Sequence, residues 1–279
     1  MHLRCRDAVV DLQQVAIMGV LNVTPDSFSD GGLWLDPKKA VEHGLQMDAH
    51  GARIIDMGGE STRPGAEPVP EQDELERVLP VIEALHARTG TPISIDTRKP
   101  RVAREACIAG ASIINDTAGE TGAEMDEVVA ENKVGVAVMH SRGTPATMKE
   151  MTSYQDVVTD VCSFLADRAR QLEDAGVPHD AIAIDPGIGF AKTVDQNLEL
   201  LRRLDEVVAV GYPVMIGTSR KSFIGAVLDV PEADRLEGTA ATVVWSMVKG
   251  ARIVRVHDVE QIARTVKMIE AIDPSKDSS

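Results

Sequence analysis

The segment PISIDTRKPRVAREACIAGASIIND, residues 92–116, contains the repeating unit that decides the fold. Its first part, 92–96, is a short apolar run typical of a buried strand, and 99–109 has the period of an amphipathic helix. Gly110 follows, at a position where glycine can adopt the positive φ of a helix C-cap, and 112–116 reads as a second strand. The segment therefore predicts a strand, a helix and a parallel strand in succession.

The same alternation recurs along the whole chain. Further strands are predicted at 15–22, 53–57, 134–139, 181–185, 214–217 and 252–257, and further helices at 37–50, 71–88, 154–175 and 194–208. Glycine also precedes a strand at Gly51 and Gly250. Eight apolar strands joined by right-handed helical crossovers predict one α/β domain, a TIM (β/α)₈ barrel over 15–273. An open doubly wound sheet is the alternative.

The two ends of the chain lie outside this repeat. Residues 1–14 form an N-terminal extension, for which we expect a short plug or hairpin beneath the barrel. Residues 274–279 have the composition of a flexible tail. The total of 279 residues suits a single barrel, for which roughly 250 residues are typical.

The composition excludes several classes of protein. There are 29 Lys and Arg residues against 44 Asp and Glu residues, a formal charge of −15, which argues against general binding to nucleic acid or anionic membranes. The sequence lacks an 18-residue apolar run and a secretory signal, so we expect a cytoplasmic protein. Cys5, Cys107 and Cys162 are widely spaced, as expected of reduced thiols.

Polar residues gather where the predicted strands end. In a parallel barrel all strand carboxyl ends open onto one face, where active sites are built. A single such residue is equally well explained as a helix cap or a loop hydrogen bond, but nearly every strand contributes one. These residues are Asn22, Asp56, Asp96, Asn115, Asp116, His140, Asp185, Ser219, Arg220, Lys221, Arg255, His257 and Asp258, together with the segment 58–63.

Two kinds of ligand chemistry follow from these residues. The cationic group comprises Arg63, Arg220, Lys221, Arg255 and His257, a set suited to phosphate or diphosphate. Asp96, Asn115 and Asp185 supply two carboxylates and an amide, which suit a flat heterocycle rich in hydrogen-bonding groups.

Three further features have more than one interpretation. Asn22 can contribute one oxygen ligand to Mg²⁺, although an asparagine at a strand end is more commonly a turn residue. The glycines of 185–192 let a loop approach a ligand closely, whereas a dinucleotide-binding loop would need a third glycine and an early strand. His140 has no second histidine at zinc spacing, so a core histidine is the simpler interpretation.

Eight collinear segments between about residues 16 and 270 resemble the dihydropteroate synthases of the bacterial folate pathway. They are MGVLNVTPDSFSDGG (18–32), IIDMGGESTRPGA (54–66), SIDTRKP (94–100), IINDTAG (113–119), VMH with TPATM (138–148), DPGIGFAK (185–192), GTSRKSFIG (217–225) and VRVHDV (254–259). The resemblance implies a pterin-binding TIM barrel and a transferase. Its reaction would join 7,8-dihydropterin-6-ylmethyl diphosphate to 4-aminobenzoate, giving dihydropteroate and diphosphate.

The resemblance also implies roles for individual residues. The pterin would be held by Asp96, Asn115, Met139, Asp185 and Lys221. The diphosphate would be held by Thr62, Arg63, Arg255 and His257, and by Asn22 through Mg²⁺. The aminobenzoate slot would be formed by Phe28, Pro64, Phe190 and Ser222. Asp96, Lys221, Arg255, His257 and Arg63 would carry the catalysis.

Further expectations come with this resemblance. Loops 23–33 and 59–70 would act as lids, the protein would be a homodimer, and sulfonamides would compete with aminobenzoate. We hypothesise that diphosphate leaves before the amine attacks, because cations and Mg²⁺ at the mouth would stabilise the departing group. After His140 the sequence has Ser141 and Arg142, where the family commonly has a further apolar residue. The sequence therefore does not determine how side chains pack beside the pterin.

Two alternative functions share the barrel. A pterin-dependent methyltransferase domain has the same pterin contacts, but it has no diphosphate to bind, so the cationic residues argue against it. A catalytically inactive pterin-binding paralogue is argued against by the complete set of cationic residues.

Overall fold

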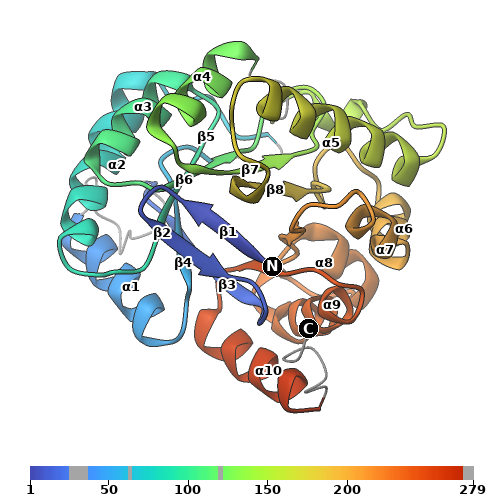
Figure 1. The fold of residues 1–279 in the computed structure, drawn as a ribbon. Helices are drawn as coiled ribbons and strands as arrows, with labels where there is room; N and C mark the ends of the chain where they lie inside the picture. Colours follow the sequence, from blue (N-terminus) through green and yellow to red (C-terminus); the bar gives the residue numbers. More distant parts are fainter. Residues whose placement is uncertain (25–36, 62–64, 119–121, 273–279) are drawn as a thin grey trace.

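In the part of the chain that the structure describes, eight parallel strands form a closed barrel surrounded by helices (Figure 1). The computed structural model describes residues 1–24, 37–61, 65–118 and 122–272. Neighbouring strands follow the order β8-β7-β6-β5-β4-β3-β10-β9. A parallel bridge between Ile184 and Val214 joins the two outermost strands, where the Ile184 amide donates to the Pro213 carbonyl at 2.9 Å. This closure confirms the predicted TIM barrel, and the alternative of an open doubly wound sheet is wrong.

The barrel strands are short and lie within one or two residues of the predicted runs. They are β3 (Ala16–Asn22), β4 (Ile54–Gly58), β5 (Ile93–Thr97), β6 (Ile113–Asp116), β7 (Gly135–Met139), β8 (Ile182–Asp185), β9 (Met215–Ile216) and β10 (Ile253–Val256). Gly51, Gly110 and Gly250 precede three of them with φ of 98°, 125° and 105°. These glycines therefore end the preceding helices in the conformation that the sequence predicts.

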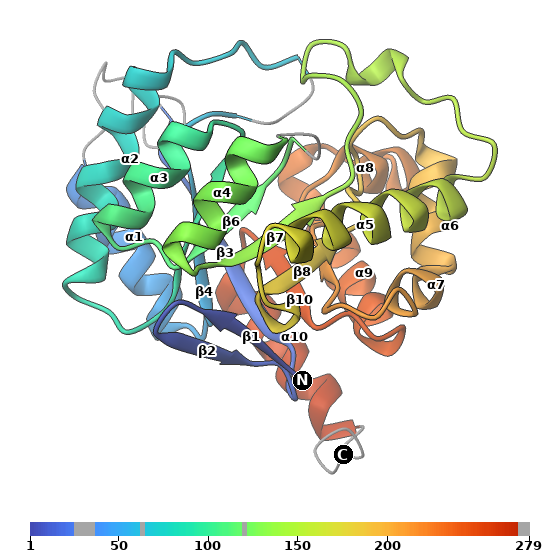
Figure 2. The same ribbon diagram turned by 45° about the horizontal axis from the view of Figure 1, so that its top comes forward.

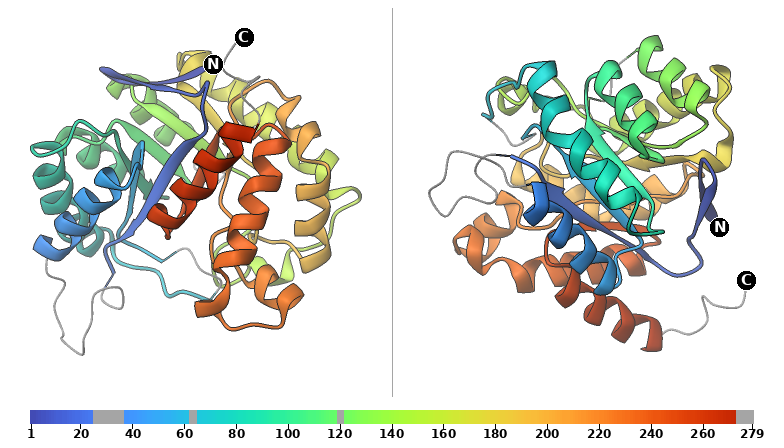
Figure 3. Two further views of the ribbon diagram at one scale, coloured as in Figure 1. Left: turned by 90° about the horizontal axis from the view of Figure 1, so that it is seen from below. Right: turned by 90° about the vertical axis from the view of Figure 1, so that its left-hand side faces the viewer.

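Helices cover the outside of the barrel. They are α1 (Pro37–Ala49), α2 (Glu71–His86), α3 (Pro100–Ala109), α4 (Ala123–Asn132), α5 (Val157–Asp174), α6 (Val194–Arg202), α7 (Leu204–Val208), α8 (Ser222–Leu228), α9 (Leu236–Val248) and α10 (Val259–Ile272). Short 3₁₀ turns occupy Met148–Glu150, His179–Ala181 and Glu232–Asp234. Figure 3 shows α9 and α10 side by side on the outer surface.

One predicted helix, 194–208, is divided in two. The break falls at Arg203, whose φ of −104° and ψ of 29° depart from helical geometry. Its guanidinium donates to the Asp156 carboxylate at the start of α5, at 2.8 Å. This contact joins residues far apart in sequence, so hydrophobic periodicity alone does not reveal it.

The N-terminal residues form an antiparallel hairpin of β1 (His2–Cys5) and β2 (Ala8–Asp11). The hairpin lies across the amino end of the barrel, on the opposite side from the loop that follows β7 (Figures 1 and 2). Leu3, Cys5, Val10 and Leu12 pack there against apolar side chains from the lowest part of the strands. A side chain at Gly135 would lie 2.8 Å from the Arg4 carbonyl oxygen, so the hairpin rests directly on β7.

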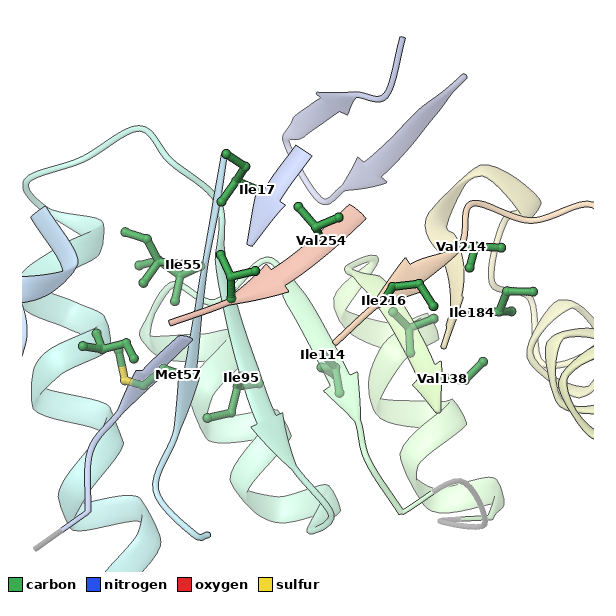
Figure 4. Close-up of a cluster of buried hydrophobic side chains, with 14 of the residues drawn as sticks. Ile17, Ile55, Met57, Ile95, Ile114, Val138, Ile184, Val214, Ile216 and Val254 are labelled. Atoms are coloured by element: carbon green, nitrogen blue, oxygen red, sulfur yellow. The ribbon is translucent and has the colours of Figure 1, made fainter. Parts of the chain in front are cut away.

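Alternation along the strands separates an outer core from an inner one. Outward side chains such as Ile17, Ile55, Ile114 and Val254 pack against the helices (Figure 4). Their neighbours point into the barrel, because successive side chains of a strand lie on opposite faces. The lower inward positions carry the apolar residues Ala16, Met18, Ile54, Ile113, Ala137, Ala183, Met215 and Ile253, and they include the buried Ser94 of β5.

Candidate active site

The second inward-facing layer is polar, and it forms the floor of the barrel mouth. Two residues beyond Ile54, Ile113, Ala183 and Ile253 stand Asp56, Asn115, Asp185 and Arg255. Asp96 of β5 pairs in register with Asn115 of β6 and joins the same layer. Period-two alternation thus places these residues directly above the apolar layer, at the carboxyl ends of the strands.

Arg255 lies between two carboxylates in this layer. Its Nε donates to Asp56 Oδ2 at 2.6 Å, and its Nη2 donates to Asp96 Oδ2 at 2.7 Å. Burial disfavours the guanidinium charge, but the Asp56 and Asp96 carboxylates hold the pKa of Arg255 above its ordinary value. Arg255 therefore remains charged and neutralises part of the buried negative charge.

Asp96 is the carboxyl group whose titration is displaced into the neutral range. Burial raises the pKa of Asp96 to about 7, and the neighbouring carboxylates of Asp56 and Glu74 also raise it. Arg255 and a hydrogen bond from Thr117 Oγ1 to Asp96 Oδ1, at 3.0 Å, act in the opposite direction. A carboxyl group with this titration behaviour in a barrel mouth is typical of a functional site.

Asn115 is oriented by Asp56. Its Nδ2 donates to Asp56 Oδ2 at 3.2 Å, so its carbonyl oxygen turns away from that carboxylate. Asn115 Oδ1 and Asp56 Oδ1 are both buried without a hydrogen-bond partner among the described residues. Buried acceptors of this kind are rare, and a ligand with N–H donors would satisfy them.

Asp185 and Lys221 form the opposite side of the mouth. The Gly187 amide donates to Asp185 Oδ1 at 2.7 Å, and Lys221 Nζ donates to the Ile188 carbonyl and lies 4.4 Å from the centre of the Phe190 ring. Burial and the nearby Arg255 lower the pKa of Lys221 to about 8, against the opposing effect of Asp185. Burial also raises the pKa of Asp185.

The glycines of 185–192 serve packing within the protein, and their predicted close approach to a ligand stays a prediction. A side chain at Gly187 would lie 2.0 Å from the His140 carbonyl oxygen, and one at Gly189 would lie 2.9 Å from Lys221 Cδ. Both residues have positive φ, at 68° and 84°. The loop therefore needs glycine to pack against β7 and Lys221.

His140 is a core residue. Its ring contacts Phe164 edge-on, with centroids 4.9 Å apart, and its Nδ1 lies 3.0 Å from Lys192 Nζ. Burial, Lys192 and Arg142 lower the pKa of His140 to about 2, so the ring is neutral. Lys192 Nζ also donates to two carbonyls of its own loop, those of Gly187 and Phe190, both at 3.0 Å. Together with its contact to His140, which follows β7, these bonds tie the 185–192 loop to the end of β7.

The remaining rim residues differ in how they are engaged. Ser219 Oγ accepts from the His257 amide at 3.1 Å and lies 3.0 Å from His257 Nδ1. Arg220 pairs with Asp258 through Nε at 3.0 Å and Nη2 at 2.5 Å, so this predicted anion ligand is already neutralised. Asn22 is half-buried at the end of β3, opposite Gly58 of β4.

The other predicted ligands fall into two groups. Met139 is buried at the end of β7, in register with Asp185, and Ser222 is exposed at the first position of α8. The predicted residues Phe28, Thr62, Arg63 and Pro64 lie outside the described residues.

A partly buried ion network holds the base of the loop after β4. Lys99 Nζ donates to Glu60 Oε2 at 2.6 Å, to Glu74 Oε2 at 2.5 Å and to the Val69 carbonyl at 2.8 Å. Thr97 Oγ1 donates to the other oxygen of Glu74 at 2.8 Å. The two ends of the loop, at Glu60 and Val69, are therefore fixed beside β5.

Sequence reasoning missed the central role of Asp56. It placed Asp56 at a strand end and gave it no function, yet this carboxylate contacts both Arg255 and Asn115. The signal that reveals it is alternation, because Asp56 lies two residues beyond the inward-facing Ile54. The same alternation distinguishes Asn115, which faces inward, from Asp116, which faces outward. Asp116 Oδ2 lies 3.9 Å from Arg168 Nη2 in the helical layer.

The donor set is compatible with Mg²⁺ only if most ligands come from elsewhere. Among residues 1–24, 37–61, 65–118 and 122–272, no group of three or more His, Cys, Asp or Glu side chains is arranged to hold a metal. Asn22 offers one neutral oxygen at the rim. This suits a cation that retains waters and takes its remaining ligands from a bound diphosphate.

The fold and the mouth residues define a class, that of pterin-binding enzymes. The family model described as "pterin binding enzyme" matches residues 18–257. A curated dihydropteroate synthase from Bacillus subtilis is 49% identical over 261 residues, which cover 93% of this chain and 89% of the relative. The chain belongs to the dihydropteroate synthase family.

Solved structures agree with this assignment. The Yersinia pestis dihydropteroate synthase in a sulfonamide drug complex is 40% identical, with a TM-score of 0.93, and covers 98% of this chain and 100% of its own. The Thermus thermophilus enzyme in complex with 4-aminobenzoate is 43% identical, with a TM-score of 0.88 and the same coverage.

Proposed function

We propose that this chain catalyses the dihydropteroate synthase reaction, the transfer of a dihydropterin-6-ylmethyl group from diphosphate to 4-aminobenzoate. Family membership supports this activity, and one structural observation carries it. The barrel mouth combines acceptors that are buried without a partner among the described residues, together with the Lys221 donor, for a heterocycle, and a charged Arg255 for an anion. A methyltransferase domain would need only the first of these features.

The pterin ring, in this proposal, lies on the polar layer. Asp96, Asn115 and Asp185 accept from ring N–H groups, and Lys221 donates to ring acceptors. Arg255 exchanges its bond with Asp96 for the incoming ligand, because the ring competes for the same carboxylate. Met139 packs against the ring, and Phe190, stacked on Lys221, forms part of the aminobenzoate slot with Ser222.

The reaction, in this proposal, begins with cleavage of the methylene carbon–oxygen bond. The bonding electron pair leaves with diphosphate, and positive charge develops on the pterin, where the Asp96 carboxylate stabilises it. Arg255 and His257 stabilise the departing anion. The amine nitrogen of aminobenzoate then attacks the methylene carbon and loses a proton. If rapid-quench experiments never detect diphosphate ahead of dihydropteroate, this order of steps is wrong.

Mg²⁺ is the cation that we propose for the diphosphate, with Asn22 as its protein ligand. When bound, it would withdraw charge from the leaving group. A diphosphate-release assay with both substrates tests this, run with Mg²⁺ and with a chelator. We expect turnover to fall at least tenfold with the chelator and to recover when Mg²⁺ is restored. Tight pterin binding without any turnover would instead identify an inactive paralogue.

Sulfonamides are proposed as competitors of aminobenzoate. The Yersinia pestis relative was solved with a sulfonamide drug and the Thermus thermophilus relative with 4-aminobenzoate, and Phe190 is available here for an aromatic ring. We expect a sulfonamide to raise the apparent KM for aminobenzoate and to leave the maximal rate unchanged. A change in maximal rate alone would contradict competition.

A homodimer is proposed on the outer face of α8, α9 and α10. These three helices carry exposed apolar side chains, namely Val227 and Leu228 in α8, Trp245 and Val248 in α9, and Met268 and Ile272 in α10. Exposed apolar patches commonly mark protein interfaces. Light scattering should give twice the chain mass for the native protein and a monomer for Val248→Asp. A native monomer would contradict the proposal.

The cytoplasm is the location that we propose. Cys5, Cys107 and Cys162 are thiols without a disulfide, and burial raises the pKa of Cys5 and Cys107 to about 12, which makes them unreactive. Separately, none of the helices in the described part of the chain is long and apolar enough to cross a membrane.

A further inference from the structure

We propose that Asp56 is a positioning residue that fixes the orientation of the Asn115 amide and the Arg255 guanidinium, and so sets which hydrogen-bonding groups the pocket floor presents. The inference rests on the proposed function, since it concerns how the same pocket selects its heterocycle. It adds a residue of β4 to a site otherwise attributed to β3, β5, β6, β7, β8, β10 and the loops that follow β9 and β10.

The geometry is a carboxylate oxygen shared by two donors. Asp56 Oδ2 accepts from Arg255 Nε at 2.6 Å and from Asn115 Nδ2 at 3.2 Å, and the Asp56 side chain is fully buried. A carboxylate can only accept, so the amide nitrogen of Asn115 must face it. Asn115 Oδ1 is thereby turned away from Asp56, where it is buried without a partner among the described residues.

This orientation gives the pocket its polarity. With Oδ1 exposed to the ligand, Asn115 accepts from a ring N–H group; with the amide reversed, it would present two donors and reject that group. A buried acceptor left unpaired weakens binding by about 10- to 100-fold, which is enough to favour one arrangement strongly. Asp56 Oδ1, which is also buried without a partner among the described residues, adds a second acceptor. The class of ligand selected is therefore a heterocycle with adjacent N–H donors.

The same carboxylate couples the two halves of the substrate. Arg255 is the residue expected to meet the diphosphate, and Asp56 holds its Nε while Asp96 holds Nη2. When the heterocycle competes for Asp96, the Asp56 contact keeps the guanidinium at the mouth. Removing Asp56 should therefore weaken the pterin diphosphate and leave aminobenzoate unaffected.

The test is an exchange of the two side chains. We would prepare Asp56→Asn, Asn115→Asp and the double variant. The affinity for dihydropterin-6-ylmethyl diphosphate would be measured by titration calorimetry without aminobenzoate, together with both KM values, kcat and the thermal midpoint. Asp56→Asn should weaken pterin diphosphate binding about 10- to 100-fold, the loss expected for an unpaired buried group, with the KM for aminobenzoate changed less than about twofold.

The double variant distinguishes positioning from a purely structural role. In it, the amide introduced on β4 would donate to the carboxylate introduced on β6, whose second oxygen still accepts from the ligand. Affinity should therefore recover about tenfold relative to either single variant. Asp126→Asn is the matched control, because Asp126 also forms a buried pair, with Arg168 at 2.9 Å, in the helical layer. It should lower the thermal midpoint without changing pterin affinity.

Each outcome decides the inference. Affinity within twofold of wild type in Asp56→Asn, or a double variant that binds no better than Asn115→Asp, would overturn it. If Asp56→Asn does not fold, the comparison of the double variant with Asn115→Asp alone still decides. A wild type that binds the pterin diphosphate but never releases diphosphate would overturn the proposed function, while the calorimetric comparison would still test Asp56.

Discussion

The two ends of this barrel use the same strands and the same alternation for opposite purposes. At the amino end, inward positions carry Met18, Ile54 and Ile113, and the β1–β2 hairpin covers them with apolar side chains. One step further along the strands, the inward positions carry acids, an amide and an arginine. The change from apolar to charged takes only two residues, as in Ile54 and Asp56.

This contrast shows that the amino end of the barrel contributes folding stability and that the mouth reduces it. The amino end buries mainly carbon against carbon, although the inward-facing Ser94 keeps a buried hydroxyl without a partner among the described residues. The mouth retains two buried oxygens without partners among the described residues, a carboxyl with a raised pKa and a lysine with a lowered pKa. Groups in such states cost folding free energy and persist where a ligand uses them. Substitutions at the two ends should therefore have opposite effects on activity and on stability.

The largest effect is expected at the mouth, from Lys221→Ala. Loss of one charged donor from a preorganised site should lower kcat/KM for the pterin diphosphate about 100- to 1,000-fold. Because burial lowers the pKa of Lys221 to about 8, its charge is costly in the folded state, so the thermal midpoint should stay level or rise. Diphosphate release and thermal unfolding measure the two effects.

Lys249→Ala is the control for this change, because Lys249 is paired with Asp205 on the surface at 2.6 Å. It should leave kcat/KM unaltered. A Lys221→Ala protein with nearly full activity, or one that unfolds well before wild type, would contradict the proposed division between mouth and amino end.

Leu12→Ala should produce the reverse pattern at the amino end. Leu12 is fully buried in the apolar lower layer, so its truncation should cost about 2–5 kcal/mol of unfolding free energy. Catalytic constants measured well below the unfolding transition should match wild type. Val9→Ala is the matched control, since Val9 lies in β2 of the same hairpin and is 61% exposed. It should change stability by less than about 0.5 kcal/mol.

The sequence predicts the barrel better than it predicts the site. Strand positions follow from local apolar runs and glycine caps, so all eight were located. The division of 194–208 into α6 and α7 falls at Arg203, whose contact with Asp156 is not contained in any local pattern. The antiparallel pairing of β1 with β2 is likewise a detail that the plug or hairpin expectation left open.

Within the site, residue type and strand end were predictable, whereas partners were not. Asp96, Asn115 and Asp185 were identified from their positions, and the structure brings them into one layer. The sequence alone does not reveal that Arg255 turns inward to Asp56 and Asp96, or that Arg220 is paired with Asp258. Both pairings depend on which charged side chains come into contact in the folded barrel. Contacts between residues distant in sequence produce no periodic pattern from which they could be predicted.

A third prediction concerns the pH dependence of kcat/KM for the pterin diphosphate, which reports on the free enzyme. Asp96, with a pKa raised to about 7, loses its charge as pH falls below that value, and Lys221, lowered to about 8, loses its charge as pH rises. We expect a bell-shaped profile with limbs near 7 and 8, each falling about tenfold per pH unit.

Two variants assign the limbs of this profile. Asp96→Asn should remove the acid limb at a lower overall rate, and Lys221→Arg should shift the alkaline limb upward, because arginine stays charged. An unchanged acid limb in Asp96→Asn would show that another group controls it. Residues at the amino end of the barrel should not affect the pH dependence of kcat/KM, so Leu12→Ala should reproduce the wild-type profile.

The smallest effect should come from the ion pairs that fasten the hairpin from outside. Asp180 accepts from Arg4 at 2.6 Å and lies 3.1 Å from His2, with all three side chains partly exposed. Exposed pairs contribute less than about 1 kcal/mol, so Asp180→Asn should destabilise the protein far less than Leu12→Ala.

The pH dependence of this contribution follows from the pKa of Asp180. Burial acts to raise that pKa, but the contacts with Arg4 and His2 outweigh burial and lower it. Its contribution is therefore present above the ordinary aspartate pKa and is lost as pH falls through the lowered value. Denaturant unfolding at about pH 7 in low and high salt measures it. A loss comparable to that of Leu12→Ala, or one insensitive to salt, would mean that charge rather than apolar contact closes this end of the barrel.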